Sequence, residues 1–218
     1  MKYKAVIFDL DGTLINTLED IGNSVNRVLV RMGFPPHPLE KYREFVGDGS
    51  RMLVTRALGE GQRDEKRIME CLEGFFEDYS RNWRDLTRPY EGIPELLDGL
   101  AARGIKMAVL SNKRHDLTQK CVNYFFPGGR FDAIFGQRDS VPRKPHPAGA
   151  LEIADILMLP PKKFLYAGDS GTDMETALAA QMFSLGVLWG FRTQEELMEK
   201  GAEAVIDHPL RLLDLLEN

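Results

Sequence analysis

Apolar residues follow two different patterns along this chain. The run Ala5–Phe8 is apolar at every position and includes β-branched residues, which is typical of a strand buried on both faces in a parallel sheet. Beyond it, apolar residues recur at helical spacing, first at Leu18, Ile21, Val25, Val28, Leu29 and Met32 and later at Ile68, Leu72, Phe75, Phe76, Tyr79 and Trp83. Shorter helices are expected over residues 39–46 and 51–58. The pattern predicts an all-helical unit inserted directly after the first strand.

The second half of the chain alternates between the two patterns. Residues 87–94 are rich in breakers and are expected to lead out of the helical unit. Strands are then expected over residues 105–110, 133–135, 164–167, 184–188 and 204–206, and helices over residues 94–102, 115–125, 148–157, 172–180, 195–200 and 210–216. This alternation predicts an α/β fold with a doubly wound, Rossmann-like parallel sheet. We expect residues 1–15 and 88–218 to form this core and residues 16–87 to form an inserted all-helical cap domain.

Reactive side chains follow several of the predicted strands. Asp9 and Asp11 come directly after the first strand, and Gly12 gives the backbone freedom to turn both carboxylates toward one cation. The other such groups are Ser111 and Asn112 after the second strand, Lys144 in a proline-rich loop after the third, and Asp169 and Asp173 after the fourth. Taken singly, each has an ordinary alternative as a turn former, a helix cap or a surface lysine.

The predicted topology brings these groups together. All strands of a parallel sheet end on the same edge, where open α/β sheets bind their ligands. Four carboxylates gathered there without a cation would repel one another strongly, so a bound metal is expected. Oxygen ligands suit a hard ion, and Mg²⁺ is the default choice.

Composition narrows the class of protein. The chain has 218 residues, 43% of them hydrophobic and 28% charged, as in a globular protein. A net charge of -5 gives no indication of nucleic acid or an anionic membrane as partner, and no long apolar run is present. Cys71 and Cys121 lie in apolar helical patterns and are expected to be core thiols rather than a disulfide or metal site. We expect a cytoplasmic protein, either a monomer or a homodimer.

The reactive groups also form four motifs in a fixed order. Asp9-Leu10-Asp11-Gly12-Thr13 is the first, Ser111 the second, Lys144 the third, and Gly168-Asp169 with Asp173 the fourth. In these motifs the chain resembles the haloacid dehalogenase-like hydrolases over its whole length, and the helical insertion is similar to the helical cap of that superfamily. Residues 45–49, 141–145, 168–174 and 186–192 resemble bacterial phosphoglycolate phosphatases. Haloacid dehalogenases proper lack the second Asp of the first motif, so Asp11 favours phosphoryl transfer.

The resemblance implies a Mg²⁺-dependent phosphatase with an aspartyl-phosphate intermediate. Asp9 is then the nucleophile, Asp11 the general acid and base, and Thr13 the group that orients Asp11. The metal ligands are expected among the Asp9 carboxylate, the Asp11 backbone carbonyl, Asp169 and Asp173, with Asp173 more suited to orienting metal-bound water or Lys144. Lys144, Ser111 and the backbone N–H groups around Gly12 are expected to bind phosphoryl oxygens, and Asn112 is a further candidate for substrate contact.

Substrate choice is expected to lie in the helical domain. A lid that closes over a sheet-edge site excludes water and meets the leaving group. The candidate substrate-facing segment is the loop with Gly47, Gly49 and Arg51, for which a plain helix–helix turn is the alternative. The resemblance implies 2-phosphoglycolate, a small phosphorylated metabolite whose carboxylate needs a cationic partner. Arg51 is the first choice for that partner and Arg43 the second.

Other reactions fit the same residues. The rivals within the superfamily are a pyrophosphatase, a sugar-phosphate phosphatase and a phosphomutase that returns the phosphoryl group to a sugar. From another class, a phospho-accepting signalling receiver domain also combines clustered acids, Mg²⁺ and a lysine on a doubly wound sheet. The helical insertion and the second acid, Asp11, favour repeated turnover over a receiver.

Overall fold

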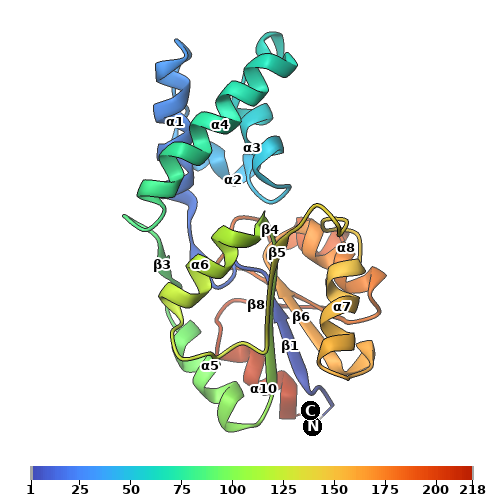
Figure 1. Cartoon of the computed structure of the whole chain (residues 1–218). Coiled ribbons are helices and arrows are strands. Elements are labelled where there is room, and N and C mark those ends of the chain that lie inside the picture. The colour runs from blue at the N-terminus through green and yellow to red at the C-terminus, as the bar shows by residue number, and fades with distance from the viewer. Residues whose placement is uncertain (1, 218) are drawn as a thin grey trace. The chain divides into compact units, whose positions relative to one another are not determined.

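The chain divides into two compact units. A computed structural model describes residues 2–217. One unit contains the chain up to Ile15 and from Pro89 onward, and the other contains Asn16–Arg88 (Figure 1). No helix among the described residues has the length and apolar character needed to cross a membrane.

The first unit is built on a six-stranded parallel sheet with the order β5-β4-β1-β6-β7-β8. The strands are β1 (Ala5–Phe8), β4 (Lys106–Arg114), β5 (Ala133–Gln137), β6 (Phe164–Gly168), β7 (Phe183–Val187) and β8 (Ala204–Ile206). The first strand therefore lies inside the sheet, where Ile7 pairs with Ala108 on one side and Tyr166 on the other. Burial on both faces explains why β1 is apolar at every position.

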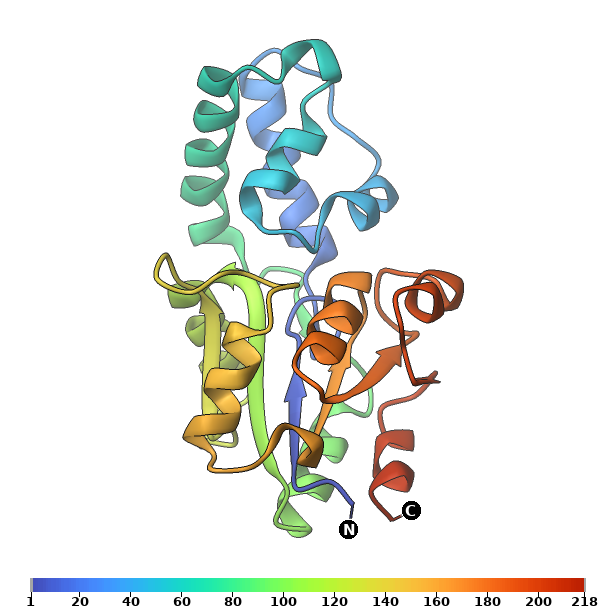
Figure 2. The same cartoon turned by 90° about the vertical axis from the view of Figure 1, so that its right-hand side faces the viewer.

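Helices cover both faces of this sheet (Figures 1 and 2). One face carries α5 (Ile93–Ala102), α6 (His115–Phe125) and α10 (Arg211–Glu217), and the other carries α7 (Ala148–Ile156) and α8 (Gly171–Ala179). Two short elements, η3 (Pro161–Lys163) and α9 (Gln194–Glu199), complete the unit. Ile7, Leu110, Ile153, Tyr166 and Ala177 belong to one buried cluster, which holds α7 and α8 against the strands. The predicted α/β doubly wound sheet is confirmed.

The second unit is entirely helical apart from its ends. It contains α1 (Leu18–Arg31), η1 (Leu39–Lys41), α2 (Tyr42–Phe45), α3 (Ser50–Ala57), η2 (Glu60–Gln62) and α4 (Glu65–Asn82). Helix α4 packs against α1 and α3, and the helical spacing seen in the sequence marks its buried face. Buried residues on the two long helices are Ile21, Val25, Val28 and Leu29 of α1 and Ile68, Cys71, Phe75 and Tyr79 of α4.

The two ends of the helical unit are tied to each other. Short strands β2 (Ile15–Asn16) and β3 (Arg88–Pro89) pair in a two-stranded sheet. Beside them, the buried carboxylate of Asp20 accepts hydrogen bonds from the backbone N–H groups of Leu86 and Thr87 and from the Thr87 hydroxyl, the last at 2.7 Å. Three donors on one carboxylate fix where the chain leaves the unit.

Two elements differ from the sequence prediction. Strand β4 was expected to end at Leu110, but it continues to Arg114, with a register irregularity between Leu110 and Arg114. Ser111 and Asn112 are therefore part of the strand rather than residues that follow it. Residues 39–46 were expected to form one helix, but the structure has a 3₁₀ turn and a single α turn, η1 and α2.

We expect Asp20→Ala to destabilise the protein by about 2–4 kcal/mol, because it leaves the backbone N–H groups of Leu86 and Thr87 and the Thr87 hydroxyl without their acceptor, and the two Thr87 donors are buried. Denaturant titration of the two variants measures the change in the free energy of unfolding. Asp20→Asn keeps one carbonyl oxygen as acceptor and should lose less. Equal losses for the two variants would show that the hydrogen bonds to Leu86 and Thr87 do not stabilise the fold.

Candidate active site

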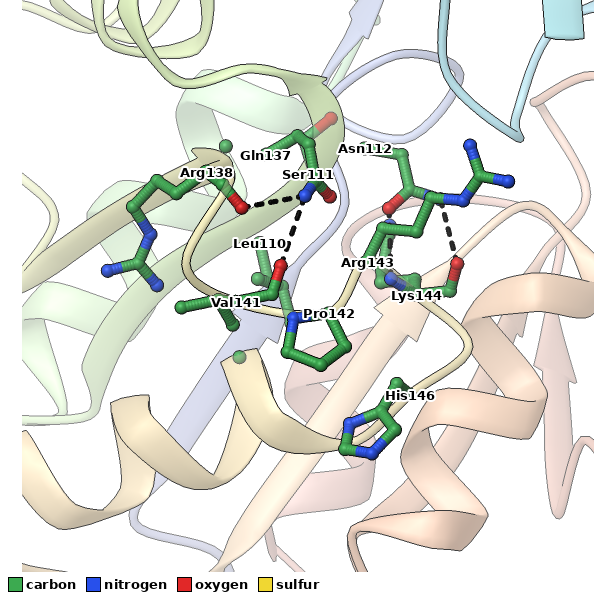
Figure 3. A pocket seen from close by; sticks show the side chains of 12 residues that line it. Leu110, Ser111, Asn112, Gln137, Arg138, Val141, Pro142, Arg143, Lys144 and His146 are labelled. Carbon is green, nitrogen blue, oxygen red and sulfur yellow. Dashed lines mark hydrogen bonds between the residues drawn. The ribbon is translucent and has the colours of Figure 1, made fainter.

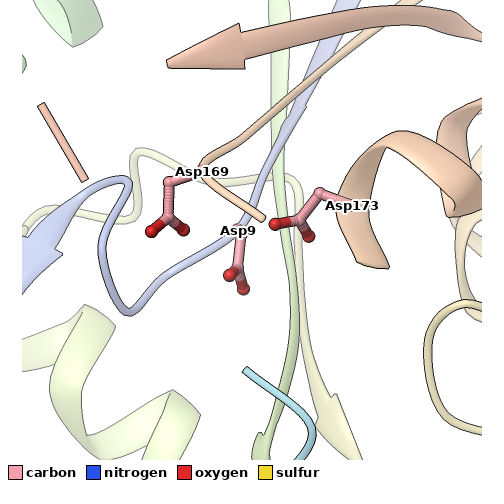
Figure 4. Close-up of side chains that lie close together, drawn as sticks. All are labelled: Asp9, Asp169 and Asp173. Carbon is pink, nitrogen blue, oxygen red and sulfur yellow. The ribbon is translucent and has the colours of Figure 1, made fainter. Parts of the chain in front are cut away.

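Three carboxylates meet at the carboxyl ends of β1 and β6. Asp9 follows β1, Asp169 follows β6, and Asp173 lies in the first turn of α8. Each offers one oxygen that lies within 4.8 Å of the others (Figure 4). Their exposed fractions are 7%, 2% and 0%, so all three acids are buried. The convergence expected from the parallel topology is therefore present for these three residues.

The turn after β1 depends on Gly12. The backbone N–H groups of Thr13 and Leu14 donate to the Leu10 carbonyl, and Gly12 has a φ of 90°. An L side chain rarely adopts this conformation. A Cβ on Gly12 would also lie 2.3 Å from a carboxylate oxygen of Asp169. Gly12 therefore brings the β1 turn and the β6 loop together at a distance that no other residue type permits.

Asp169 is held from two further segments. Its Oδ1 accepts a hydrogen bond from the Thr13 hydroxyl at 3.3 Å, and its Oδ2 accepts one from the Phe191 backbone N–H at 2.8 Å. The Trp189 indole in turn donates to the Thr13 carbonyl at 2.9 Å. Thr13 was expected to orient Asp11, but its hydroxyl is directed at Asp169. The roles of Trp189 and Phe191 were missed. The indole of Trp189 donates to a backbone carbonyl and Phe191 donates through its backbone N–H, and neither partner can be recognised from residue type.

Asp173 serves as both a cap and an ion-pair partner. Its Oδ2 accepts from the Ser170 hydroxyl at 2.6 Å and from the Ser170 backbone N–H at 3.1 Å, which closes a capping box at the start of α8. Its Oδ1 accepts from Lys144 Nζ at 2.6 Å. The ordinary cap role and the role in orienting Lys144, which the sequence left as alternatives, are thus both present in one side chain.

Lys144 lies between two of the acids. Its Nζ is 2.9 Å from Asp9 Oδ1 and 2.6 Å from Asp173 Oδ1, and its side chain is 3% exposed. The Asn112 side chain fixes the lysine backbone, accepting from Lys144 N at 3.0 Å and donating to Lys144 O at 3.2 Å (Figure 3). Asn112 was expected as a substrate contact, but its amide is engaged in placing the loop that carries Lys144.

Ser111 lies in β4 one residue before Asn112. It is 4% exposed, and its hydroxyl accepts a hydrogen bond from the Lys113 backbone N–H at 3.2 Å. Behind it is a cavity of about 10 Å³, lined also by Gln137 and Val141, with Gln137 donating to the Val141 carbonyl (Figure 3). A volume of this size holds about one water molecule, which is too little for a substrate.

Asp11 is paired with a residue that the sequence analysis did not single out. Lys113 Nζ donates to both carboxylate oxygens of Asp11, at 3.0 and 3.1 Å. The Lys113 side chain is 6% exposed and that of Asp11 18%. Side chains two residues apart on a regular strand share a face, but the apolar pattern gave no indication that β4 continues past Leu110. Had β4 been extended past Leu110, Lys113 would have been placed on the same face as Ser111.

The electrostatics of the cluster follow from burial. Burial raises the pKa of Asp9 from 3.8 to about 7, with Lys144 acting against this and Asp173 adding to it. Burial and the neighbouring Asp173 and Asp9 also raise the pKa of Asp169 well above its usual value. Burial alone would lower the pKa of Lys144, but the two neighbouring carboxylates raise it well above its usual value. The lysine therefore stays charged, while two of the acids resist ionisation unless further positive charge is supplied.

The donor set fits a hard divalent cation. Asp9 Oδ1 is buried and lacks a hydrogen-bond partner, although it lies at ion-pair distance from Lys144 Nζ. Three carboxylates with no sulfur or imidazole nearby in the cluster are the ligands that Mg²⁺ prefers. A cation there would supply the charge that the pKa values of Asp9 and Asp169 show to be needed. Asp11 does not join this group through its side chain, because Lys113 holds its carboxylate.

The residues expected to choose the substrate lie in the helical unit. Gly47 and Gly49 both have positive φ, 113° and 85°, and Gly49 precedes α3. Arg51 is about half exposed and donates to Glu65 Oε2 at 2.5 Å. Asp48 in the same loop accepts from Arg56 at 2.5 Å. Arg43 is an exposed residue of α2. The loop is thus fixed by its own ion pairs.

Comparison with known proteins agrees with this site. Residues 6–187 match the family model of the haloacid dehalogenase-like hydrolases, a span that includes every acid of the cluster and both buried lysines. The chain belongs to this family. It is 32% identical to the phosphoglycolate phosphatase of Psychrobacter arcticus, over 99% of this chain and 96% of that protein. It is 31% identical to the phosphoglycolate phosphatase of Aquifex aeolicus, over 99% and 97% of the two chains.

Solved structures of the family share the whole architecture. A Lactobacillus delbrueckii subsp. bulgaricus protein proposed to be a phosphoglycolate phosphatase superposes with a TM-score of 0.94 at 31% identity, covering 99% of both chains. Like these relatives, the chain is a haloacid dehalogenase-like phosphatase, phosphoglycolate phosphatase-like in sequence and fold. The resemblance inferred from the four motifs is confirmed, and the receiver-domain alternative is set aside.

We expect the metal-free protein to lose stability as the pH rises from about 4 to about 7. The pKa values of Asp9 and Asp169 are raised in the folded state, so the folded protein binds more protons than the unfolded chain over this range. A cation that binds the ionised acids removes this cost, so Mg²⁺ should raise the melting temperature more at about pH 8 than at about pH 5.5. Differential scanning fluorimetry with Mg²⁺ and with chelator measures both effects.

The Asp9→Asn variant is the matched control for this titration. It removes the ionisable group but keeps the side-chain shape, so its Mg²⁺-dependent shift should be smaller and should vary less with pH. A shift of the same size at both pH values in the unmodified protein would contradict a metal site at Asp9.

Proposed function

We propose that this phosphatase hydrolyses phosphomonoesters in a Mg²⁺-dependent reaction through an aspartyl-phosphate on Asp9, with 2-phosphoglycolate as its substrate. The observation that carries the proposal is the position of Lys144 Nζ, 2.9 Å from Asp9 and 2.6 Å from Asp173 beside Asp169. This arrangement sets a carboxylate nucleophile beside a fixed positive charge that can bind a phosphoryl oxygen.

In the first step, an Asp9 oxygen attacks phosphorus and the bond from phosphorus to the leaving oxygen breaks. Asp11 gives its proton to that oxygen, so the alcohol leaves neutral. In the second step, Asp11 takes a proton from a water molecule that attacks phosphorus, and Asp9 is released with inorganic phosphate. The Asp11 side chain lies two residues from Asp9 and outside the acid cluster, so in this scheme it exchanges protons without being a metal ligand.

The remaining residues bind and orient. Lys144 and the Ser111 hydroxyl would donate to phosphoryl oxygens, and Asn112 keeps Lys144 in position through its backbone. Thr13 and the Phe191 N–H orient Asp169, which would hold the metal together with Asp9 and the Asp11 carbonyl. Mg²⁺, when bound, neutralises the acids and polarises the phosphoryl group.

The helical unit, Asn16–Arg88, is proposed to act as the cap. Its paired ends, β2 and β3, are candidate hinges, and the loop with Gly47, Gly49 and Arg51 is the candidate segment for contact with the leaving group. The substrate assignment is supported by the relatives named phosphoglycolate phosphatase, which align over nearly the whole chain. Both cysteines are buried and free, which favours a reducing cytoplasmic setting.

We expect Asp9→Asn to fold normally and to lose turnover of 2-phosphoglycolate by several orders of magnitude, because an amide is not a competent nucleophile here. Steady-state phosphate release with Mg²⁺ measures the loss. Acid-quenched protein incubated with labelled substrate should carry phosphate in the unmodified enzyme and none in the variant.

The matched control is Asp98→Asn, which changes an exposed aspartate on α5 that pairs with Arg130. It should keep unmodified turnover and labelling. Substantial phosphate release by Asp9→Asn, with Asp98→Asn active, would refute Asp9 as the nucleophile while leaving the family assignment intact.

We expect chelation of divalent ions to abolish turnover, and Ca²⁺ to fail to replace Mg²⁺. Ca²⁺ accepts more oxygen ligands at longer distances and can bind a carboxylate through both oxygens, which would misdirect Asp9. Phosphate release after treatment with chelator, then after addition of each ion, tests this. Full activity in chelator, or equal rates with the two ions, would count against a Mg²⁺ site formed by Asp9 and Asp169.

A further inference from the structure

The ion pair between Lys113 and Asp11 places a second cation at the site. The ammonium group contacts both oxygens of the residue proposed to protonate the leaving group, at 3.0 and 3.1 Å. Lys113 lies in β4 and Asp11 follows β1, two strands that are hydrogen-bonded neighbours in the sheet. The pair therefore belongs to the sheet unit, and its geometry does not depend on where the helical unit lies.

The pair contributes little to the stability of the fold. Burying a lysine at 6% exposure costs desolvation free energy that an ion pair recovers only in part. An apolar residue at this position would serve packing as well or better. A buried cation that contacts the catalytic acid is more readily explained by binding an anion during the reaction.

Distances limit which atoms of a bound substrate can come within reach of Lys113 Nζ. To take the proton, the leaving oxygen must lie about 2.6–3.2 Å from an Asp11 oxygen. It then lies at most about 6 Å from Lys113 Nζ. In 2-phosphoglycolate one methylene carbon joins the ester oxygen to the carboxylate, which places the carboxylate oxygens ~3 Å further along. An ammonium has three N–H donors and can bind Asp11 and this carboxylate together.

We propose that Lys113 binds the carboxylate of the leaving group and so selects phosphate esters with an anionic group one carbon from the ester oxygen. This inference rests on the proposed function, since it names how that same site recognises its substrate. It moves the choice of substrate from the helical unit to β4. Arg51, the alternative reader, is already paired with Glu65 at an exposed position.

The test compares two substrates of similar size. These are 2-phosphoglycolate and 2-hydroxyethyl phosphate, which has a neutral hydroxymethyl group in place of the carboxylate. Lys113→Gln removes the charge but keeps an N–H donor for Asp11, and Lys113→Arg keeps the charge. The ratio of kcat/KM for the two substrates isolates carboxylate binding, because a general effect on Asp11 changes both values equally.

We expect the unmodified enzyme to prefer 2-phosphoglycolate, and Lys113→Gln to reduce that preference roughly 10- to 100-fold, the size of one charge-assisted hydrogen bond. Lys113→Arg should restore much of the preference. Lys162→Met, which removes an exposed lysine at the opposite edge of the sheet before β6, should leave the ratio unchanged. Arg51→Ala is the competing variant, and a selective loss of the preference there would assign the role to Arg51 instead.

The outcomes separate the two proposals. If Lys113→Gln lowers both kcat/KM values by the same factor, Lys113 only positions Asp11 and this inference is wrong, while the proposed function stands. If the unmodified enzyme hydrolyses 2-hydroxyethyl phosphate as well as 2-phosphoglycolate, the substrate proposal and this inference both fail. Should Lys113→Gln not fold, calorimetric binding of the two esters to Asp9→Asn and to Asp9→Asn/Lys113→Met, which removes the charge with a side chain of similar length, decides the question in the presence of Mg²⁺. An identical preference in both would overturn the role of Lys113.

Discussion

The site depends on one buried ammonium group shared by two carboxylates. Lys144 lies between Asp9 and Asp173, and both distances are short enough for strong attraction in a poorly hydrated environment. Without this charge, three buried acids within 4.8 Å would repel one another and would bind protons instead of a metal or a substrate. The lysine does not supply all the charge required, because Asp9 and Asp169 still have raised pKa values. The positive charge that is still missing favours the binding of a divalent cation to the cluster.

Groups that take no part in the proposed reaction hold this unfavourable cluster of acids in place. Asn112 binds the backbone of Lys144, Ser170 closes a capping box with Asp173, and Gly12 leaves room for Asp169. Buried ion pairs are weak sources of stability, so the free energy that holds the acids in place comes from the apolar sheet and its two helical layers. Ile7 and Tyr166, both fully buried, lie in the strands that carry Asp9 and Asp169. The hydrophobic core and the charged edge are therefore parts of the same strands, and the core holds the charged edge in place.

The strands and the meeting of the acids depend on periodicity and topology, and they could be predicted from the sequence. Individual hydrogen-bond partners depend on detailed geometry, and they could not. Ala5–Phe8 could be identified as an interior strand because burial on both faces demands apolar residues throughout. The meeting of Asp9, Asp169 and Asp173 followed from the common edge of parallel strands. By contrast, the partner of Thr13 depends on a rotamer, and the role of Phe191 depends on a backbone N–H. The extension of β4 to Arg114 could not be predicted, because Ser111 and Asn112 are polar and the strand pattern ends before them.

That unpredicted extension has the largest consequence for function. By continuing β4 past Leu110, the chain places Ser111 and Lys113 two residues apart on one strand, beside the turn that carries Asp11. The site then has two buried lysines with different neighbours: Lys144 contacts Asp9, the proposed nucleophile, and Lys113 contacts Asp11, the proposed acid. In the proposed reaction the two ends of a phosphate ester meet these same two residues, the phosphoryl group at Asp9 and the leaving group at Asp11. In a chain with a net charge of -5, a substrate that is anionic at both ends needs local positive charge at each, and in the two proposals above Lys144 and Lys113 supply it.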